Sequence, residues 1–241
     1  MLMAKERNPN LDLLMLVVDR LGMLSDQMVY LGGCATGLLI TDPAAPPVRE
    51  TKDVDVIVEV SSHAEYYKLS KKLRTAGFRE DQSEGAPLCR WIMENVILDV
   101  MPTDSKILGF SNYWYPAAMK ESDEIVLPDG KKINMVTAPY FLATKLEAFE
   151  GRGRGDYLLS HDLEDLISVI DGRPGIVQEV RESDPELKNY LSEKIHELIN
   201  NPRFVEALPG KVPGDNASQA RLPIIHERLK AIVEINNFQR G

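Results

Sequence analysis

The sequence predicts an α+β protein in which a mixed β-sheet flanked by helices is followed by a helical bundle. Short runs of β-branched and aromatic residues between turn residues occur up to about residue 136. Beyond that point the apolar residues recur at helical spacing instead. The 241 residues are enough for two domains, and the change of period places them at 1–136 and 137–241.

Three helices are expected in the first domain. The first covers residues 9–24, because an Asn-Pro pair provides an N-cap and a first helical residue before leucines and valines at helical spacing. The second covers residues 34–40. The third covers residues 63–76 and begins with a serine and a glutamate at the spacing of a capping box.

The strands of the first domain are expected where apolar runs lie between turn residues. They are residues 28–31, 54–60, 78–81, 88–93, 96–100, 124–127 and 132–136. Two pairs of these strands are expected to form hairpins, one joined by Glu94-Asn95 and the other by Pro128-Asp129-Gly130. Residues 101–120 are expected to be irregular, with short helices.

The second domain is expected to be entirely helical. Glycine and proline residues interrupt its periodic segments and supply the breaks between helices. The predicted helices are residues 139–150, 161–170, 175–182, 185–200 and 223–236. A loop over residues 209–216 precedes the last helix.

Three aspartates in apolar, β-rich runs are the main candidates for chemistry. Asp53 and Asp55 are two apart in one strand, so both side chains project from the same face, while Val54 points into the core. Asp99 lies in a second run of this kind and can approach from a neighbouring strand. Converging carboxylates repel one another and are hard oxygen ligands, so the pattern predicts a site for Mg²⁺, with Mn²⁺ as an alternative.

Gly32 and Gly33 stand between a short strand and the start of a helix. Glycines at this position let a phosphate group approach the backbone, and the helix N-terminus favours an anion. A phosphate cradle beside metal-binding carboxylates is what nucleotidyl transfer from an NTP requires. Cofactor and substrate are therefore expected to be Mg²⁺ and an NTP.

The order of these motifs resembles a known family. Gly-Gly, Asp-x-Asp and a lone Asp match the nucleotidyltransferases of the DNA polymerase beta superfamily, and the stretch Arg49 to Asp55 is similar to their bacterial AbiEii type, whose members are toxins of toxin–antitoxin pairs. A later segment is similar to the Lys…Arg…Asp-x-x-Asp-Leu pattern of that type. Its matching residues are Lys145, Arg152, Arg154, Asp162, Asp165 and Leu166.

The resemblance implies a role for each matching residue. Asp53 and Asp55 would hold the metals, and Asp99 would bind or deprotonate the acceptor hydroxyl. Lys145 would contact the triphosphate or pair with an acidic residue, either Asp162 or Asp165, which would otherwise position the acceptor. The remaining candidates would contact phosphate or steady the active-site loop: Gly32, Gly33, Arg49 and Thr51.

The resemblance also implies a nucleotidyltransferase-type sheet, a helical half closing a cleft, and a cognate antitoxin as partner. Two features depart from the family pattern. The stretch from Cys34 to Lys52 is longer than in compact members and has loop composition around residues 41–47. Gly33 stands where many members have serine, which removes a hydroxyl but keeps the backbone donor.

Composition limits the range of functions. The net charge of −9 argues against extensive non-specific binding along nucleic acid. It does not exclude an RNA or tRNA acceptor that is bound by a local basic patch. No apolar run is long enough to cross a bilayer, so no membrane partner is expected. Two cysteines, Cys34 and Cys89, fit a reducing cytoplasm, where the protein is expected to work.

The sequence therefore predicts an enzyme that moves NMP from an NTP to an acceptor hydroxyl, with a toxin-like role and RNA or another macromolecule as acceptor. Two alternatives stay open. One is a nucleotidyltransferase that modifies a small molecule such as an aminoglycoside, for which an acidic chain is suited. The other is a non-catalytic nucleotide-binding module.

Overall fold

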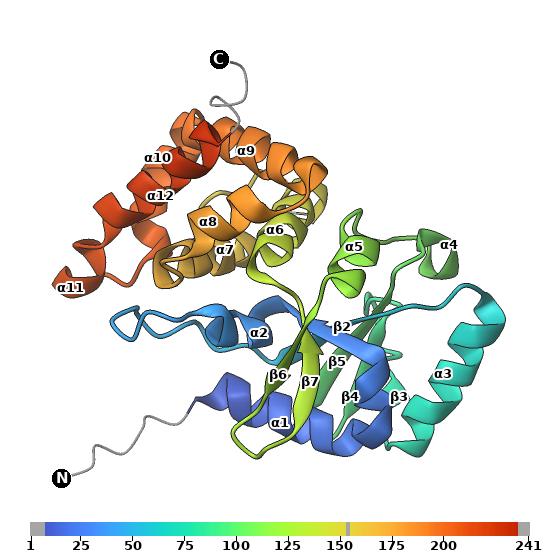
Figure 1. Ribbon diagram of the computed structural model, residues 1–241. Coiled ribbons are helices and arrows are strands. Elements are labelled where there is room, and N and C mark those ends of the chain that lie inside the picture. Colours follow the sequence, from blue (N-terminus) through green and yellow to red (C-terminus); the bar gives the residue numbers. More distant parts are fainter. Residues whose placement is uncertain (1–7, 153–154, 236–241) are drawn as a thin grey trace, which may run out of the picture. The chain divides into compact units, whose positions relative to one another are not determined.

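The computed structural model describes residues 8–152 and 155–235, and the chain forms two compact units (Figure 1). The first unit holds residues up to 37, residues 49–111 and residues 122–135. The second begins at residue 136 and also takes in two earlier segments, 38–48 and 112–121. No helix of the described residues has the length and apolar character needed to span a membrane.

A seven-stranded sheet forms the centre of the first unit, with the strand order β3-β4-β5-β2-β1-β7-β6. β2 pairs parallel with β5, and β1 pairs parallel with β7, whereas the other neighbours are antiparallel. The strands are β1 (Met28–Leu31), β2 (Asp53–Val58), β3 (Arg79–Glu80), β4 (Arg90–Met93), β5 (Val96–Pro102), β6 (Asp123–Val126) and β7 (Lys132–Met135). The sheet is therefore mixed, and the predicted α+β class is confirmed.

The first unit also contains four helices, and the predicted helices of this half are present. α1 (Pro9–Leu21) begins at the Asn8 cap and contacts β2 and β5 (Figure 1). The others are α2 (Gly32–Leu39), whose last residues belong to the second unit, α3 (His63–Thr75) and α4 (Ser105–Leu108).

The largest boundary difference from the sequence prediction is at the end of the first helix. The first helix was expected to reach residue 24, but α1 ends at Leu21, and a 3-10 turn, η1 (Gly22–Gln27), follows it. Gly22 has a φ of 53°, which an α-helix cannot continue through. The end of α1 is thus set by one glycine.

The second unit is built from helices that pack around apolar side chains. α6 (Ala138–Arg152) contacts α7 (His161–Gly172), and α9 (Pro185–Ile199) contacts α12 (Leu222–Glu234). The remaining elements are α5 (Tyr115–Lys120), α8 (Ile176–Glu182), α10 (Pro202–Ala207), η2 (Leu208–Lys211) and α11 (Asn216–Gln219). The sequence prediction missed α10 and α11, which are only one to two turns long.

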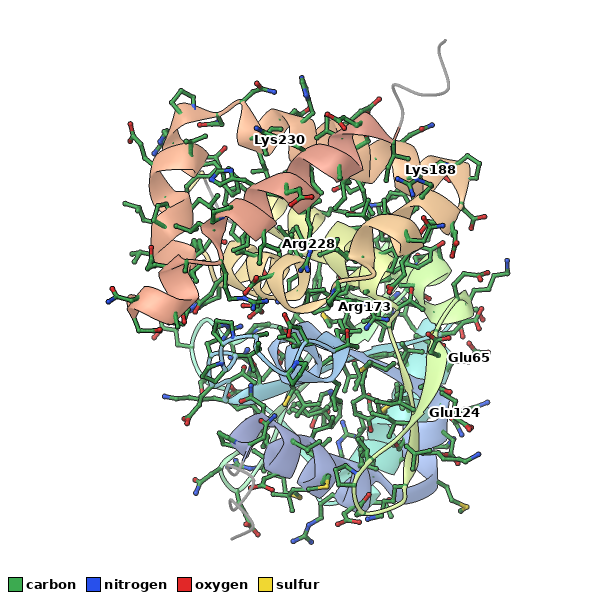
Figure 2. The ribbon with its side chains drawn as sticks, turned by 60° about the vertical axis from the view of Figure 1, so that its left-hand side comes forward. Glu65, Glu124, Arg173, Lys188, Arg228 and Lys230 are labelled. Atoms are coloured by element: carbon green, nitrogen blue, oxygen red, sulfur yellow. The ribbon has the colours of Figure 1, made fainter. Side chains whose placement is uncertain are left out.

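Residues 38–48 lie against α7 and α12 of the second unit. The backbone N–H groups of Thr41 and Asp42 both donate to the Gly172 carbonyl at 2.9 Å. Arg221 donates to Asp171 and to Asp42. Arg173 donates to the Leu39 carbonyl at 2.8 Å, and Figure 2 shows it within the helical unit. Much of the long stretch between Gly33 and Asp53 is therefore bonded to the helices that follow it by more than 120 residues.

Candidate active site

A single transverse row of the sheet brings the first-unit candidates together. The register pairs Leu31 of β1 with Asp55 of β2, Asp55 with Asp99 of β5, and Asp99 with Arg90 of β4. Paired residues on adjacent strands share a face, so these side chains lie side by side on one surface of the sheet. Asp53, two residues before Asp55, projects from the same face.

The opposite face of β2 is core. Val54 and Val56 are fully buried, as the alternation of side chains predicts. Asp53 and Asp55, by contrast, are partly exposed, and Asp99 is buried with 7% of its surface exposed. One face of β2 is therefore apolar, and the other carries Asp53 and Asp55 before it continues into the buried Ile57.

Gly32 follows Leu31 directly and opens α2. Its φ is 75°, and a Cβ at this residue would coincide with the Asp55 carboxylate. Only glycine combines that backbone conformation with a carboxylate lying against the start of the helix. The first glycine of the predicted cradle is thus required by the position of Asp55.

Gly33 is covered by the two other candidates of this region. A Cβ at Gly33 would lie 2.8 Å from Nη2 of Arg49 and 3.3 Å from Oγ1 of Thr51. These side chains lie in the space that a side chain at residue 33 would enter, so a larger residue there would have to displace the end of Arg49.

Thr51 and Asp53 are joined by a short hydrogen bond. Thr51 Oγ1 donates to Asp53 Oδ1 at 2.5 Å, which fixes the orientation of that carboxylate. The segment before β2 is itself held by Asn10 of α1. The Asn10 amide donates to the Arg49 carbonyl at 2.8 Å and accepts from the Thr51 N–H at 3.0 Å.

Arg90 is the cation of this surface. Its Nε and Nη2 donate to the two oxygens of Asp99 at 2.9 and 2.8 Å, and Nη2 also lies 3.9 Å from Asp53 Oδ2. The hydrogen bonds to Asp99 are the main reason that the pKa of Arg90 is raised above its usual value. Arg90 therefore touches two of the three carboxylates that the sequence singles out.

The negative charge of this surface is felt by a buried thiol. Cys34, in the first turn of α2, is 2% exposed. Burial raises the pKa of its thiol, and the charges of Asp55 and Asp53 raise it further. The cysteine, the two aspartates and the start of α2 therefore share one electrostatic environment.

The carboxylates fit a divalent cation in part. Mg²⁺ is commonly held by one or two carboxylates together with water and substrate phosphates, and Asp53 and Asp55 can supply those two. Asp99 is engaged by Arg90. Across the described residues, no group of three or more His, Cys, Asp or Glu side chains is arranged to hold a metal ion. The metal-binding roles of the three aspartates remain predictions.

The candidates of the second unit form a separate cluster inside the helices. Lys145 of α6 donates to Asp165 of α7 at 2.6 Å and to Asp162 at 3.3 Å. All three residues are at least nine-tenths buried. Asp162 lies in the first turn of α7, after the Ser160 cap. Arg154 and the side chain of Arg152 lie outside the described residues.

Two residues of the site were not among the sequence candidates. Asn10 gave no signal, because its partners are some 40 residues away in sequence. Arg90 did leave one. A two-residue loop at Glu94-Asn95 sets the hairpin register, and that register pairs Arg90 with Asp99.

Comparison with known proteins gives similarity at the level of fold. No protein-family model matches the sequence, and no curated protein matches it. The structure is similar to an antigenic nucleotidyltransferase-like protein from Paracoccidioides brasiliensis, with a TM-score of 0.48 and 22% identity over 83% of this chain and 93% of that one.

A second solved structure comes from H. pylori and bears a provisional description as a nucleotidyltransferase. It is similar with a TM-score of 0.47 and 13% identity, over 98% of this chain and 95% of that one. Because both TM-scores are below 0.5, the functional proposal below depends on the site residues and not on these proteins.

Proposed function

We propose that this chain is a nucleotidyltransferase that moves NMP from an NTP to an acceptor hydroxyl in the presence of Mg²⁺. The observation that carries the proposal is the register of β1, β2 and β5. It aligns Asp55 with Asp99 on the face that also bears Asp53, and it ends β1 at the glycines that open α2. Carboxylates and a phosphate-binding helix start are then neighbours.

Each residue of this surface has a task in the proposed reaction. Asp53 and Asp55 bind the cation, which when bound neutralises triphosphate charge and activates the attacking oxygen. Thr51 orients Asp53 through its hydrogen bond. Gly32 and Gly33 are proposed to contact phosphate through their backbone N–H groups at the start of α2, and Arg49, whose guanidinium lies against Gly33, adds a positive charge there.

Asp99 is the residue proposed to act on the acceptor. It is aligned with Asp55, so it is suited to accept a proton from a hydroxyl that approaches the same surface. Its bidentate contact with Arg90 fixes the orientation of the carboxylate. An oriented carboxylate within reach of the hydroxyl is what a general base requires.

The finer parts of the proposal rest on the resemblance described above. The AbiEii-like stretches support RNA, tRNA included, or another macromolecule as acceptor, a toxin-like role and an antitoxin as partner. Lys145, Asp162 and Asp165 are retained as candidates for contact with nucleotide or acceptor. Their mutual ion pairs support a second role, in joining α6 to α7.

The reaction is tested by incubating the purified protein with each α-labelled NTP, Mg²⁺ or Mn²⁺, and either total RNA or an aminoglycoside. We expect label to appear on RNA and to be lost in Asp53→Ala, with a rate at least about a thousandfold lower because a metal ligand is missing. Label on the aminoglycoside instead would identify a small-molecule transferase.

The matched control is Asp123→Ala, which removes an exposed carboxylate from β6 in the same unit. Transfer should be unchanged in this variant. Tight NTP binding without transfer to any acceptor would favour the non-catalytic module and overturn the proposed reaction.

A further inference from the structure

The guanidinium of Arg90 lies among the carboxylates of the sheet surface and offsets their negative charge. It is 2.8 and 2.9 Å from the Asp99 oxygens and 3.9 Å from Asp53. On the other side of Asp55 in the row, β1 presents Leu31. Arg90 is thus the cation at the β4 end of this row.

We propose that Arg90 is an internal counter-ion that withholds Asp99 from a divalent cation. A bidentate guanidinium occupies both oxygens of the carboxylate, and its charge repels a second cation brought to the same group. Arg90 and a divalent cation are then alternative partners of Asp99. This inference rests on the proposed function for the presence of a cation at Asp53 and Asp55.

The burial of these side chains indicates that the two partners can exchange. The Arg90 side chain is 25% exposed and that of Asp53 is 34% exposed, whereas the Asp99 side chain is 10% exposed. Solvent and ions therefore reach the guanidinium and Asp53 first. In the metal-free protein Arg90 offsets the repulsion between carboxylates, and removing it exposes Asp99 to the cation as an additional ligand.

The test measures Mn²⁺ binding without nucleotide, by isothermal titration and by the rise in melting temperature that Mn²⁺ produces. In Arg90→Gln we expect the affinity for Mn²⁺ to rise about tenfold, the worth of one charge-assisted contact. The metal-free variant should melt below the wild type, and Mn²⁺ should restore the difference. Arg79→Gln, on the adjacent strand β3, removes an equal charge and should change neither quantity.

A double substitution shows whether Asp99 is the ligand released. Asp99→Asn in the Arg90→Gln background should abolish the tenfold gain, whereas a gain that persists would overturn the inference. If Arg90→Gln does not fold, Arg90→Lys keeps the charge but loses the bidentate geometry. Its affinity should then rise by a smaller factor, and wild-type affinity would overturn the inference.

The outcomes separate this inference from the proposed function. Equal Mn²⁺ affinities in the wild type and in Arg90→Gln, including no binding by either, overturn the role of Arg90 even where label transfer is normal. A tenfold gain in a protein that transfers no label supports the role of Arg90 and overturns only the transfer reaction.

Discussion

The two units of the molecule each place one basic side chain between two carboxylates, but they do so in different surroundings. In the first unit Arg90 contacts Asp99 and Asp53 across strands of the sheet, and its side chain is 25% exposed. In the second unit Lys145 contacts Asp162 and Asp165 between two helices, and its side chain is 9% exposed.

The difference shows that burial decides whether a cation between two carboxylates can be replaced by another cation. A partly exposed cation can be exchanged for another, because water solvates the group that leaves. Removing a buried cation takes a charge partner from carboxylates that lie in a medium of low dielectric constant, which costs several kcal/mol. We therefore interpret the arginine cluster (Arg90, Asp99 and Asp53) as a site at which the cation can be exchanged. The lysine cluster (Lys145, Asp162 and Asp165) is interpreted as a fixed connection between α6 and α7.

The sharpest test of this contrast is Lys145→Met. The substitution leaves Asp162 and Asp165 buried without this ammonium, so we expect the free energy of unfolding to fall by about 3 kcal/mol or more. Urea unfolding followed by circular dichroism measures it. Lys194→Met, which removes partly exposed pairs with Glu150 and Glu197, is the control and should cost less than about 1 kcal/mol.

Equal losses in the two lysine variants would mean that burial does not distinguish the lysine cluster. A Lys145→Met protein of normal stability with a raised KM for NTP would instead favour the nucleotide contact implied by the resemblance.

Arg221→Gln extends the test to another enclosed ion pair of the second unit. Arg221 donates to both oxygens of Asp171, at 2.9 and 2.8 Å, and to Asp42 at 2.6 Å. We expect a loss of about 2 kcal/mol in the free energy of unfolding, since Asp171 is buried and loses the guanidinium that both its oxygens accept from.

Proteolysis offers a second readout for Arg221→Gln. Because Asp42 belongs to the segment held by this pair, cleavage within residues 38–48 should become faster. Lys230→Gln changes an exposed residue of α12, the helix that Arg221 precedes (Figure 2). It should change neither the free energy of unfolding nor the rate of cleavage. Wild-type cleavage in Arg221→Gln would show that other contacts hold the segment.

How far the sequence predicts these features depends on the range of the interactions involved. The alternation within β2 predicts that Asp53 and Asp55 share a face and that Val54 is buried, and the structure confirms the burial of Val54. Caps at Asn8, Ser62 and Ser160 predict where helices begin, because a cap depends on neighbouring residues only.

Long-range pairings are different. The parallel register that aligns Asp55 with Asp99 joins strands some 40 residues apart, and packing of the whole sheet sets it. Residues 41–47 have the composition of a loop, and nothing local indicates that they bond to Gly172 and Arg221. Arg90 is intermediate, because the loop Glu94-Asn95 implies its pairing with Asp99 once a tight hairpin is assumed.

The orientation of Asp53 gives a smaller effect. Thr51→Val removes the donor 2.5 Å from Asp53 Oδ1, and loss of such a supporting hydrogen bond typically weakens metal binding about tenfold. We expect Mn²⁺ affinity to fall by that factor without a change in melting temperature. Thr51→Ser keeps the hydroxyl and should bind as the wild type does, whereas wild-type affinity in Thr51→Val would show that this hydrogen bond does not orient Asp53 for the cation.

The smallest effect appears only at alkaline pH and reports the charge of the arginine cluster. Burial, and after it the charge of Asp99, raises the pKa of the Cys89 thiol from 9.0 to about 12. Between these values the native state keeps a proton that the unfolded chain has lost. The contribution of this thiol to the free energy of unfolding therefore falls as pH rises through this window, by at most about 1.4 kcal/mol per pH unit.

In Cys89→Ser the free energy of unfolding should fall less steeply with pH above about pH 9. Near pH 8 its pH dependence should equal that of the wild type. Asp99→Asn should lower the pKa of Cys89 in the native state, because one of the charges that raises it is gone. The fall in stability should then end at a lower pH than in the wild type. The measurement is urea unfolding at a series of pH values. A wild-type profile in Asp99→Asn would mean that burial alone protects the thiol, and that the guanidinium of Arg90 already cancels the charge of Asp99 at this distance.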